Sequence, residues 1–495
     1  MSIARSQDRI LQKHSGIMEG SIRLFNTLTG KKEDLIPIED KKIGMYVCGP
    51  TVYDSPHLGH ARAAVMFDVM SRFLEFIGYD VTYVRNYTDV DDKIINKSKE
   101  MGIPPEEIAN TYIAEYKEAM ASLGVRTPSY EPKVTEHIPE IVELIRKIIE
   151  RGYAYKSGGD VFFSIKKFKN YGKLSKRSPE DMLEGVRIDI SEQKEDPLDF
   201  ALWKAAKPGE PSWDSPWGKG RPGWHIECST MSMKYLGHTF DIHGGGKDLI
   251  FPHHENEIAQ SEAATGELFA KCWLHNGLIQ INREKMSKSL GNIINVRDAL
   301  KRWSKEAIRL FFLSHQYQNP ADFSEKIMDE SEAALERLYL TLKRLRDLSK
   351  GNEKNDKDLE ERTIAFKQQW IEAMCDDFNT AGAIGNLFDL TKAINRSIDT
   401  HGWTRTLELA LKEIENIGGI FGILESDPDE YLTADKLSKI ELEITEVEIK
   451  NLIEQRAEAR KDKDWQRADE IRSFLLSKSI ILEDKSHGTI WRVKN

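Results

Sequence analysis

The first side chains that could do chemistry together are His57 and His60, which flank Gly59. The apolar run over 43–47 predicts a short buried strand, and helical spacing over 61–70 predicts that a helix begins at the two histidines. A helix N-terminus offers free N–H groups and the positive end of the helix dipole to phosphate. Gly59 lets a nucleotide approach the backbone closely. The segment therefore predicts a phosphate or nucleotide site.

A second motif, the run Lys-Met-Ser-Lys-Ser over 285–289, lies far downstream. By itself it is typical of a solvated loop or a helix cap. Together with the two histidines it favours phosphate chemistry, because Lys285 and Lys288 would bring two ammonium groups to one loop. Asp248, which follows three consecutive glycines, is a candidate for binding ribose hydroxyls.

Two cysteines, a histidine and a glutamate suggest a metal site: Cys48 at the carboxyl end of the first strand, then Cys228, His253 and Glu257. Zinc takes thiolate, imidazole and carboxylate ligands in tetrahedral array. His253 and Glu257 are four residues apart and share a helix face, but His254 is also spaced to meet Glu257. The spacing does not choose between the two histidines, and cysteines in such places are often buried packing residues.

Strands and helices alternate over 21–137 and again over 223–295, which predicts a parallel sheet. The stretch between them has a hairpin signal at Gly158-Gly159-Asp160 and reads as an insertion, or alternatively as a separate small domain. Helical spacing dominates from about residue 296, as in a bundle. The expected fold class is α/β: a Rossmann-like parallel-sheet domain split by an insertion, followed by an α-helical bundle and a small C-terminal mixed α/β domain.

The expected boundaries follow these changes of pattern. An N-terminal extension (1–20) precedes the first half of the sheet domain (21–137), the insertion (138–222) and the second half of the sheet domain (223–295). The helical linker and bundle (296–430) and the C-terminal domain (431–495) follow.

Composition excludes several classes of protein. The 495 residues include only four cysteines, which argues against a disulfide scaffold and for a reduced, cytoplasmic protein. No apolar run approaches the ~20 residues that span a membrane, so no membrane partner is expected. The net charge is −10, but residues 450–495 hold eleven Lys/Arg against eight Asp/Glu, a local +3. A polyanion could therefore bind locally.

The two signature motifs together resemble those of class I aminoacyl-tRNA synthetases. Four surrounding segments narrow the resemblance to the cysteinyl-tRNA synthetase family: Cys-Gly-Pro-Thr-Val-Tyr at 48–53, Gly-Trp-His-Ile-Glu-Cys-Ser at 223–229, Asp-Ile-His-Gly-Gly-Gly at 241–246 and Pro-His-His-Glu-Asn-Glu at 252–257. The resemblance covers nearly the whole chain from about residue 21. One departure is Leu58, where isoleucine is more usual; both are apolar.

The resemblance implies a role for each matching position. The implied zinc ligands are Cys48, Cys228, His253 and Glu257, which leaves Cys272 and Cys375 as structural cysteines. The implied catalytic residues are His57, His60, Lys285 and Lys288. The implied ATP-binding residues are His57, Gly59, His60, Asp248, Lys285, Ser287 and Lys288. The implied cysteine pocket consists of Cys48, Thr51, Thr88, Trp224 and His243, and the substrate sulfur would bind the metal. The implied anticodon contacts are Trp465 and Asp469.

The implied reaction ligates L-cysteine to tRNA(Cys) in two steps. The cysteine carboxylate attacks the α-phosphate of ATP, with Mg²⁺ accompanying the nucleotide, and the cysteinyl group then passes to the terminal adenosine of the tRNA. Zinc binds a thiolate far more strongly than a hydroxyl, so it could separate cysteine from serine without an editing site. Trp465 and Asp469 share a helical face and could stack on a base and accept from a base amino group; a tryptophan packed in a small core is the alternative.

Two other functions compete with this one. A cysteine ligase that transfers cysteine to a small amine shares the catalytic domain but lacks a region corresponding to residues 431–495. A catalytically inert RNA-binding protein is the alternative from another class, and the intact motif residues and metal ligands argue against it. We expect a monomer.

Overall fold

The computed structural model describes residues 21–177, 194–281, 284–286, 291–351, 354–438, 446–462, 464–478, 480–485 and 488–493. The expected N-terminal extension lies outside the described residues, and so do Ser287 and Lys288 of the second signature motif.

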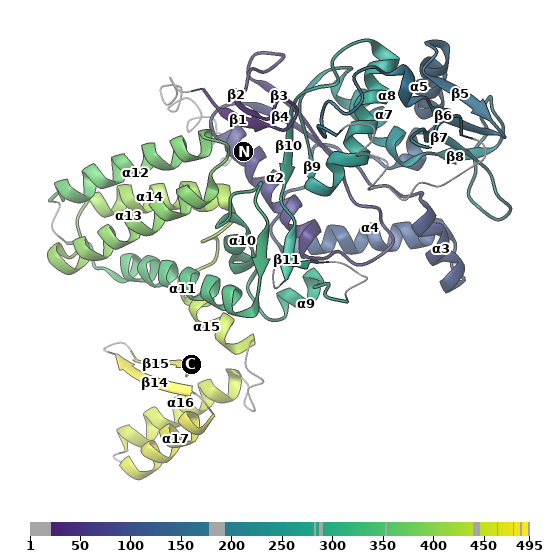
Figure 1. Ribbon diagram of the computed structural model, residues 1–495. Coiled ribbons are helices and arrows are strands. Elements are labelled where there is room, and N and C mark those ends of the chain that lie inside the picture. The colour runs from purple at the N-terminus through teal and green to yellow at the C-terminus, as the bar shows by residue number, and fades with distance from the viewer. Residues whose placement is uncertain are drawn as a thin grey trace, which may run out of the picture.

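A four-stranded parallel sheet forms the centre of the main body (Figure 1). Its strands are β3 (Lys42–Val47), β4 (Asp80–Arg85), β9 (Phe240–Gly246) and β10 (Ala270–Asn276), in the order β10-β9-β3-β4. β3 and β9, nearly 200 positions apart, pair directly, so the two halves of the expected domain form one sheet. The prediction of a parallel sheet is confirmed.

Helix α2 (Leu58–Phe76) is buried along most of its length because apolar residues occupy nearly every face. It packs on β4 and β9 on one side and on α10 (Lys305–Leu313) and α14 (Thr406–Phe421) on the other. A Cβ at Gly244 would lie 2.4 Å from the ring of Phe67. Glycine in β9 therefore allows α2 to approach the sheet closely.

Three helices follow the first part of the sheet: α3 (Asp92–Met101), α4 (Pro105–Ser122) and α5 (Ile138–Glu150). The antiparallel sheet β5 (Ala154–Ser157), β6 (Asp160–Phe163), β7 (Phe200–Ala205), β8 (Gly220–Pro222) comes next, in that order. Gly158 and Gly159 have φ of 60° and 90° and make the predicted hairpin turn.

The inserted sheet shares one apolar core with the main sheet's second half. Phe163 of β6 belongs to the same buried cluster as Ile226 of α7 (Trp224–Leu236) and Trp273 of β10. The structure therefore favours an insertion over a separate small domain. After β9 come the 3₁₀ turn η3 (Lys247–Leu249) and the π-helical turn η4 (Ile250–His254), which continues directly into α8 (Glu255–Thr265). The sequence pattern predicts a helix over 252–265, and those residues are helical, with a π-helical first turn.

A small second sheet joins β11 (Ile279–Ile281), β12 (Glu284–Lys285) and β13 (Ala321–Phe323). β11 pairs antiparallel with β12 and parallel with β13. The predicted strand leading into the second signature motif is confirmed. The N-terminal hairpin of β1 (Arg23–Asn26) and β2 (Lys31–Asp34) was not predicted, because each strand has only four residues and β2 is entirely charged.

Helices dominate from residue 296: α9 (Val296–Leu300), α10, α11 (Glu325–Asp347), α12 (Lys357–Cys375), α13 (Thr380–His401) and α14. The sequence pattern predicts a single helix over 297–315, but the structure has two helices there, because Ser304 caps α10 by accepting from the Ala307 N–H. The pair Gly418-Gly419 predicts a break in the helical pattern, and this prediction is also wrong. α14 runs through both glycines and ends at Gly422, whose φ is 64°.

The C-terminal region contains α15 (Pro428–Ser438), α16 (Glu446–Lys461), α17 (Trp465–Ser477) and the antiparallel pair β14 (Ile480–Lys485) and β15 (Gly488–Val493). The sequence pattern over 479–492 predicts this C-terminal hairpin, and the prediction is confirmed. The C-terminal region has a small core of its own, formed by Ile449, Ile471, Leu475, Ile480 and Leu482.

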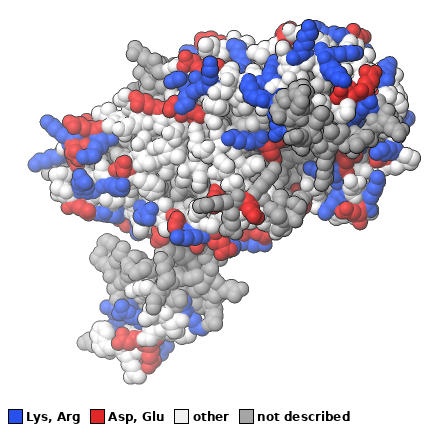
Figure 2. All heavy atoms as spheres, viewed as in Figure 1, with Lys and Arg blue, Asp and Glu red and all other residues white. Residues whose placement is uncertain are grey.

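Lys/Arg and Asp/Glu side chains interleave over the face seen in Figure 2. Among the described helices, none combines the length and apolar character that a membrane span requires.

Candidate functional site

A cavity of about 350 Å³ opens at the carboxyl ends of β3, β4 and β9. Open α/β sheets bind ligands at this edge. The site residues predicted from sequence that line it come from both halves of the sheet domain: Cys48, Thr51, His57, Gly59, His60, Trp224 and Asp248. Thr88 and His243, which were also expected in the pocket, are 2% and 0% exposed and lie behind this lining.

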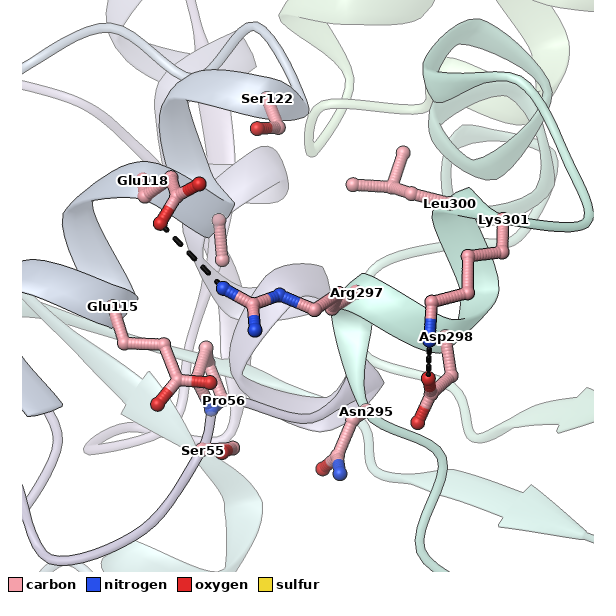
Figure 3. A pocket seen from close by; sticks show the side chains of 11 residues that line it. Ser55, Pro56, Glu115, Glu118, Ser122, Asn295, Arg297, Asp298, Leu300 and Lys301 are labelled. Atoms are coloured by element: carbon pink, nitrogen blue, oxygen red, sulfur yellow. Dashed lines mark hydrogen bonds and ion pairs between the residues drawn. The ribbon is translucent and has the colours of Figure 1, made fainter.

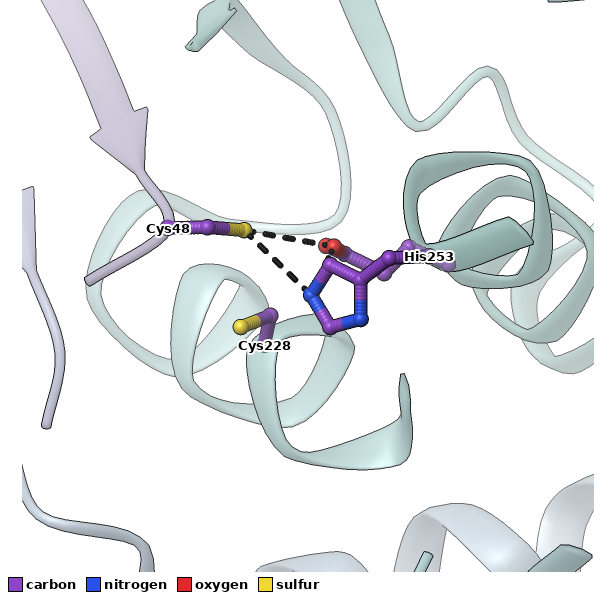
Figure 4. A group of neighbouring side chains, drawn as sticks. Cys48, Cys228 and His253 are labelled. Carbon is purple, nitrogen blue, oxygen red and sulfur yellow. Dashed lines mark hydrogen bonds and ion pairs between the residues drawn. The ribbon is translucent and has the colours of Figure 1, made fainter. Parts of the chain in front are cut away.

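Cys48 on the cavity wall meets Cys228, His253 and Glu257, which are buried behind the lining, and the ligand atoms of the four all lie within 4.8 Å of one another. Cys48 Sγ is 3.3 Å from Glu257 Oε1 and 3.6 Å from His253 Nε2, and Glu257 Oε1 is 2.9 Å from His253 Nε2. Figure 4 shows Cys48 approaching from the end of its strand, and Cys228 and His253 from two helical segments, with the Cys48 sulfur directed toward His253. Two thiols, an imidazole and a carboxylate are the donor types that zinc prefers.

Neighbouring groups orient these four side chains. Glu257 Oε2 lies 2.8 Å from Nε2 of His243, and Nδ1 of His253 lies 3.0 Å from Nδ1 of His225. The ring of Trp224 stacks on His253 with 4.2 Å between centroids. Such surrounding contacts fix the direction of metal ligands. His243 therefore supports Glu257 rather than facing the cavity.

The ambiguity between His253 and His254 is largely resolved by their partners. His254 Nδ1 is 2.8 Å from Nε2 of His275, whose Nδ1 in turn is 2.8 Å from Thr27 Oγ1. A second group, Cys48, His243, His254 and Glu257, also meets the distance criterion for a metal. The group with His253 contains both thiols, which makes it the better match for zinc.

Burial and mutual contacts shift the pKa of each group in the cluster. Burial raises the pKa of the Cys48 thiol well above its usual value. Burial opposes the Cys228 thiolate too, but contacts with Cys48 and His253 lower its pKa to about 6. Burial disfavours a charged His253, yet the Glu257 carboxylate and Cys228 raise its pKa to about 10, while His243 and His253 hold the pKa of Glu257 well below its usual range despite burial. These shifts favour negative charge on Cys228 and Glu257 but oppose it on Cys48, whose thiol must lose its proton when a cation binds.

His57 and His60 form a capping box at the start of α2. The Nδ1 of His57 accepts from the N–H groups of Gly59 and His60, and the Nδ1 of His60 accepts from the His57 N–H. Their rings stack with 3.8 Å between centroids. Because both Nδ1 atoms accept hydrogen bonds, the proton of each neutral ring lies on Nε2. The caps therefore convert both imidazoles into donors at Nε2.

The second signature motif reaches this cap through Met286. Its side chain is 9% exposed, and its Cε would lie 3.5 Å from a Cβ at Gly59. A side chain at Gly59 would also meet the His57 ring at 2.9 Å. Lys285 ends β12 and directly precedes Met286, so the Met286 side chain brings the second signature motif against the first.

Sequence reasoning missed the part played by the Asn86 side chain. Its Oδ1 accepts from the Gly49 N–H at 2.8 Å and lies 3.7 Å from Cys228 Sγ. A Cβ at Gly49 would be 1.7 Å from the Asn86 carbonyl oxygen. The position of Asn86 directly after β4, at the ligand edge, was the available signal. Its contact with the residue after Cys48 depends on the parallel pairing of β3 with β4.

A second cavity, of about 440 Å³, lies between α4 and α9 (Figure 3). Acidic and basic side chains share its wall, and Glu118 pairs with Arg297 across it at 3.7 Å. Cysteine and histidine are absent from its described lining. The smaller cavity carries the candidate chemistry.

Trp465 and Asp469 lie on α17, and the Trp465 side chain is 59% exposed. The alternative of a tryptophan packed in a small core is therefore wrong. Figure 1 shows α17 well away from the sheet edge that carries the cavity.

Comparison with protein families gives two matches. The family described as "tRNA synthetases class I (C) catalytic domain" matches residues 34–333, and the "DALR domain" matches residues 369–425. The first covers more than half of the chain.

Relatives similar along their full length carry one name. A protein of Geobacter metallireducens called "Cysteine--tRNA ligase" is 52% identical over 484 residues, covering 96% of this chain and 100% of the relative. A protein of Thermodesulfovibrio yellowstonii with the same name is 52% identical over 487 residues with the same coverage.

Solved structures share the fold at low identity. The methionyl-tRNA synthetase of Mycobacterium tuberculosis in complex with methionyl-adenylate superposes with a TM-score of 0.57 at 16% identity, covering 80% of this chain and 90% of that one. A leucyl-tRNA synthetase (LeuRS) of Agrobacterium radiobacter gives a TM-score of 0.56 at 11% identity, covering 82% and 86%. The sheet, the insertion and the helical region after it therefore follow a known architecture.

Proposed function

The chain belongs to the cysteine–tRNA ligase family, within the class I aminoacyl-tRNA synthetases, and we propose that it ligates L-cysteine to tRNA(Cys) with ATP through a cysteinyl-adenylate. The observation that carries the proposal is that Cys48 belongs to the cluster with Cys228, His253 and Glu257 and also lines the cavity that His57 and His60 line. A cluster that would bind the sulfur of cysteine and a site that would bind phosphate thus lie next to each other.

Zinc is the metal that fits the cluster, because two thiols and an imidazole accompany a single carboxylate and all four lie within reach of one ion. Cys48, Cys228, His253 and Glu257 would hold it. Bound there, zinc would offer a Lewis-acid position that favours the thiolate of cysteine over the hydroxyl of serine. A difference of a few kcal/mol would give roughly 10³–10⁴ discrimination.

The side chains around the metal ligands would position the amino acid. Trp224, which is stacked on His253, and Thr51 both line the cavity and would enclose the substrate. Thr88 donates to Glu227 at 3.0 Å and His243 contacts Glu257 at 2.8 Å. We assign these two residues to holding the pocket in shape.

ATP would bind at the start of α2, with the Nε2–H groups of His57 and His60 directed to phosphate oxygens. Gly59 leaves the backbone open there, and Asp248 on the cavity wall would bind the ribose hydroxyls. Lys285 would stabilise charge on the α-phosphate during in-line attack by the cysteine carboxylate, together with Ser287 and Lys288. Mg²⁺ would accompany the nucleotide phosphates.

The helical region and the C-terminal domain would place the tRNA. Trp465 is exposed on α17 and is free to stack on an anticodon base, and Asp469 lies on the same helical face. We also propose the domain boundaries given above, with 431–495 as the anticodon-recognition domain. The four cysteines are free thiols, which supports a cytoplasmic enzyme, and we propose that it acts as a monomer.

The direct test is aminoacylation of tRNA(Cys) by the purified protein, measured with cysteine and with serine. We expect cysteinyl-tRNA with cysteine and no measurable product with serine. Cysteine-dependent ATP–pyrophosphate exchange without transfer to tRNA would instead support the ligase that uses a small amine. No exchange by folded, zinc-loaded protein would favour the RNA-binding alternative.

A further inference from the structure

A buried arginine on α2, Arg62, lies two residues after His60 and is 0% exposed. Its guanidinium donates to five backbone carbonyls on two separate segments. Nη1 contacts the oxygens of Gly277 at 2.8 Å and Leu278 at 3.1 Å. Nη2 contacts those of Asn319 at 2.6 Å, Tyr317 at 3.4 Å and Gln316 at 3.5 Å.

This arrangement is unusual for a buried cation. Buried charges are generally paired with an opposite charge, yet Arg62 makes no ion pair with a carboxylate of the described residues. Burial lowers its pKa to about 10, so the guanidinium remains protonated at neutral pH. Its planar fork matches two sets of carbonyls at once, which a lysine ammonium does not do.

The two segments that Arg62 binds belong to the small sheet carrying the second signature motif. Gly277 and Leu278 lead directly into β11, while 316–319 lead into β13, which pairs with β11. The segments also bind each other, because the Gly277 N–H donates to the Tyr317 carbonyl at 2.7 Å and the Ala321 N–H to that of Leu278 at 3.1 Å. β11 in turn pairs with β12, which holds Lys285.

The bound carbonyls are also next to the substrate. Asn276, Gly277 and Leu278 line the cavity together with His57 and His60. α2 and β11 are in contact and lie side by side in Figure 1. Arg62 therefore connects the helix that presents the two histidines to the strand that leads to Lys285.

We propose that Arg62 is a positioning residue for ATP activation: it fixes β11 and β12, and with them Lys285, at the distance from His57 and His60 that the nucleotide requires. The proposal rests on the proposed function, and it adds a residue that belongs to neither signature motif. Arg62 touches no substrate and acts through the carbonyls it holds.

Two substitutions perturb this connection from opposite sides. Arg62→Lys keeps the charge but leaves carbonyls on at least one segment unpaired. Gly277→Ala leaves Arg62 intact and places a Cβ 2.2 Å from the Asn319 carbonyl oxygen, which forces the two bound segments apart. A matched control is Arg309→Lys. Arg309 is also 0% exposed and packs against the same helix, pairing with Asp68 at 2.9 Å, but it contacts neither segment.

The experiment measures cysteine-dependent ATP–pyrophosphate exchange, with KM for ATP and for cysteine, in the full-length zinc-loaded proteins. For Arg62→Lys and Gly277→Ala we expect KM for ATP to rise by about 10-fold or more, because buried carbonyls lose their donors. KM for cysteine should stay within about twofold, since the metal cluster lies on other elements. Arg309→Lys should lower the melting temperature while leaving both KM values within about twofold.

Equal KM values for ATP in Arg62→Lys and Arg309→Lys would overturn the proposal, as would a parallel rise of both KM values. If Arg62→Lys does not fold, Gly277→Ala decides alone. Hydrogen exchange over 277–281 and 284–286 supplies a readout independent of activity: faster exchange in Arg62→Lys than in Arg309→Lys is expected. A wild-type protein without exchange activity would refute the proposed function, whereas unchanged hydrogen exchange in Arg62→Lys would refute the role of Arg62.

Discussion

Replacing Glu257 with glutamine removes one charge from the centre of the metal cluster and changes almost no volume. The carboxylate is 0% exposed and meets three groups: His243 at 2.8 Å, His253 at 2.9 Å and Cys48 at 3.3 Å. A glutamine has one carbonyl oxygen, so its amide nitrogen must face at least one of these partners. If the amide oxygen of the glutamine accepts from His253 and Cys48, its amide N–H group faces the Nε2–H group of His243, and two donors meet without an acceptor.

The magnitude follows from these contacts. Hydrogen bonds to charged groups contribute about 1.5–3 kcal/mol each, and the protein also loses the negative charge that attracts a cation. We take about 3 kcal/mol as the total, which corresponds to roughly 10²-fold at 1.4 kcal/mol per tenfold. Glu257→Gln is therefore expected to weaken zinc binding about 100-fold, to raise KM for cysteine and to leave KM for ATP unchanged.

The assay is competition for zinc with a chelator of known affinity, followed by ATP–pyrophosphate exchange. Glu227→Gln is the matched control, because Glu227 is 1% exposed, lies beside Cys228 and accepts from Thr88 at 3.0 Å. Burial raises the pKa of Glu227 well above the usual range, which disfavours its charged form, and its carboxyl is not among the four proposed metal ligands. The zinc affinity of the Glu227→Gln protein should stay within about threefold of wild type. Wild-type zinc affinity in Glu257→Gln, or an equal loss in both variants, would refute the reasoning.

Three further outcomes are expected. Trp465→Ala should raise KM for tRNA by about 10–100-fold, since a stacked base contributes roughly 1–3 kcal/mol, and should leave ATP–pyrophosphate exchange unchanged; a loss of exchange would contradict a role limited to tRNA. Gly49→Ala should abolish cysteine activation and destabilise the protein, because the new Cβ meets the Asn86 carbonyl at 1.7 Å; wild-type melting temperature and activity would exclude that clash. Burial lowers the pKa of His275 to about 3, so the unfolded state takes up a proton first as pH falls below about 6.5 and stability drops through that window. Urea unfolding of His275→Gln should show a loss of stability between pH 6 and pH 4 that is smaller by about 1 kcal/mol per pH unit. Identical slopes in the two proteins would contradict the lowered pKa of His275.

The residues of the candidate site were predictable because their types are chemically distinctive. Cys48, Cys228, His253 and Glu257 stood out from sequence, and the structure brings them together. The spacing did not choose between His253 and His254, because both reach Glu257 from one turn earlier. Their difference lies in what surrounds them: Trp224 and His225 hold His253, and His275 holds His254.

Features that depend on tertiary contacts were less predictable. Gly418-Gly419 looked like a helix end, since glycine favours one, yet packing keeps α14 helical through both residues. The sequence does not distinguish Arg62 from a surface arginine. Its five partners are backbone carbonyls, which cannot be recognised from the types of the residues that carry them. Thr88 and His243 were expected in the cavity wall but lie behind the residues that form it. Strand and helix patterns in the sequence do not tell which of two neighbouring side chains faces a cavity.

The most direct test of the central claim is a zinc titration of metal-stripped protein, followed by cysteine-dependent ATP–pyrophosphate exchange. The structure predicts that exchange returns in proportion to zinc, reaches its maximum at one equivalent per chain, and stays low for serine throughout. Cys228→Ser should show neither tight binding nor recovery. Full exchange by the metal-free protein, or recovery in Cys228→Ser equal to wild type, would contradict the claim that the Cys48, Cys228, His253 and Glu257 cluster selects the substrate.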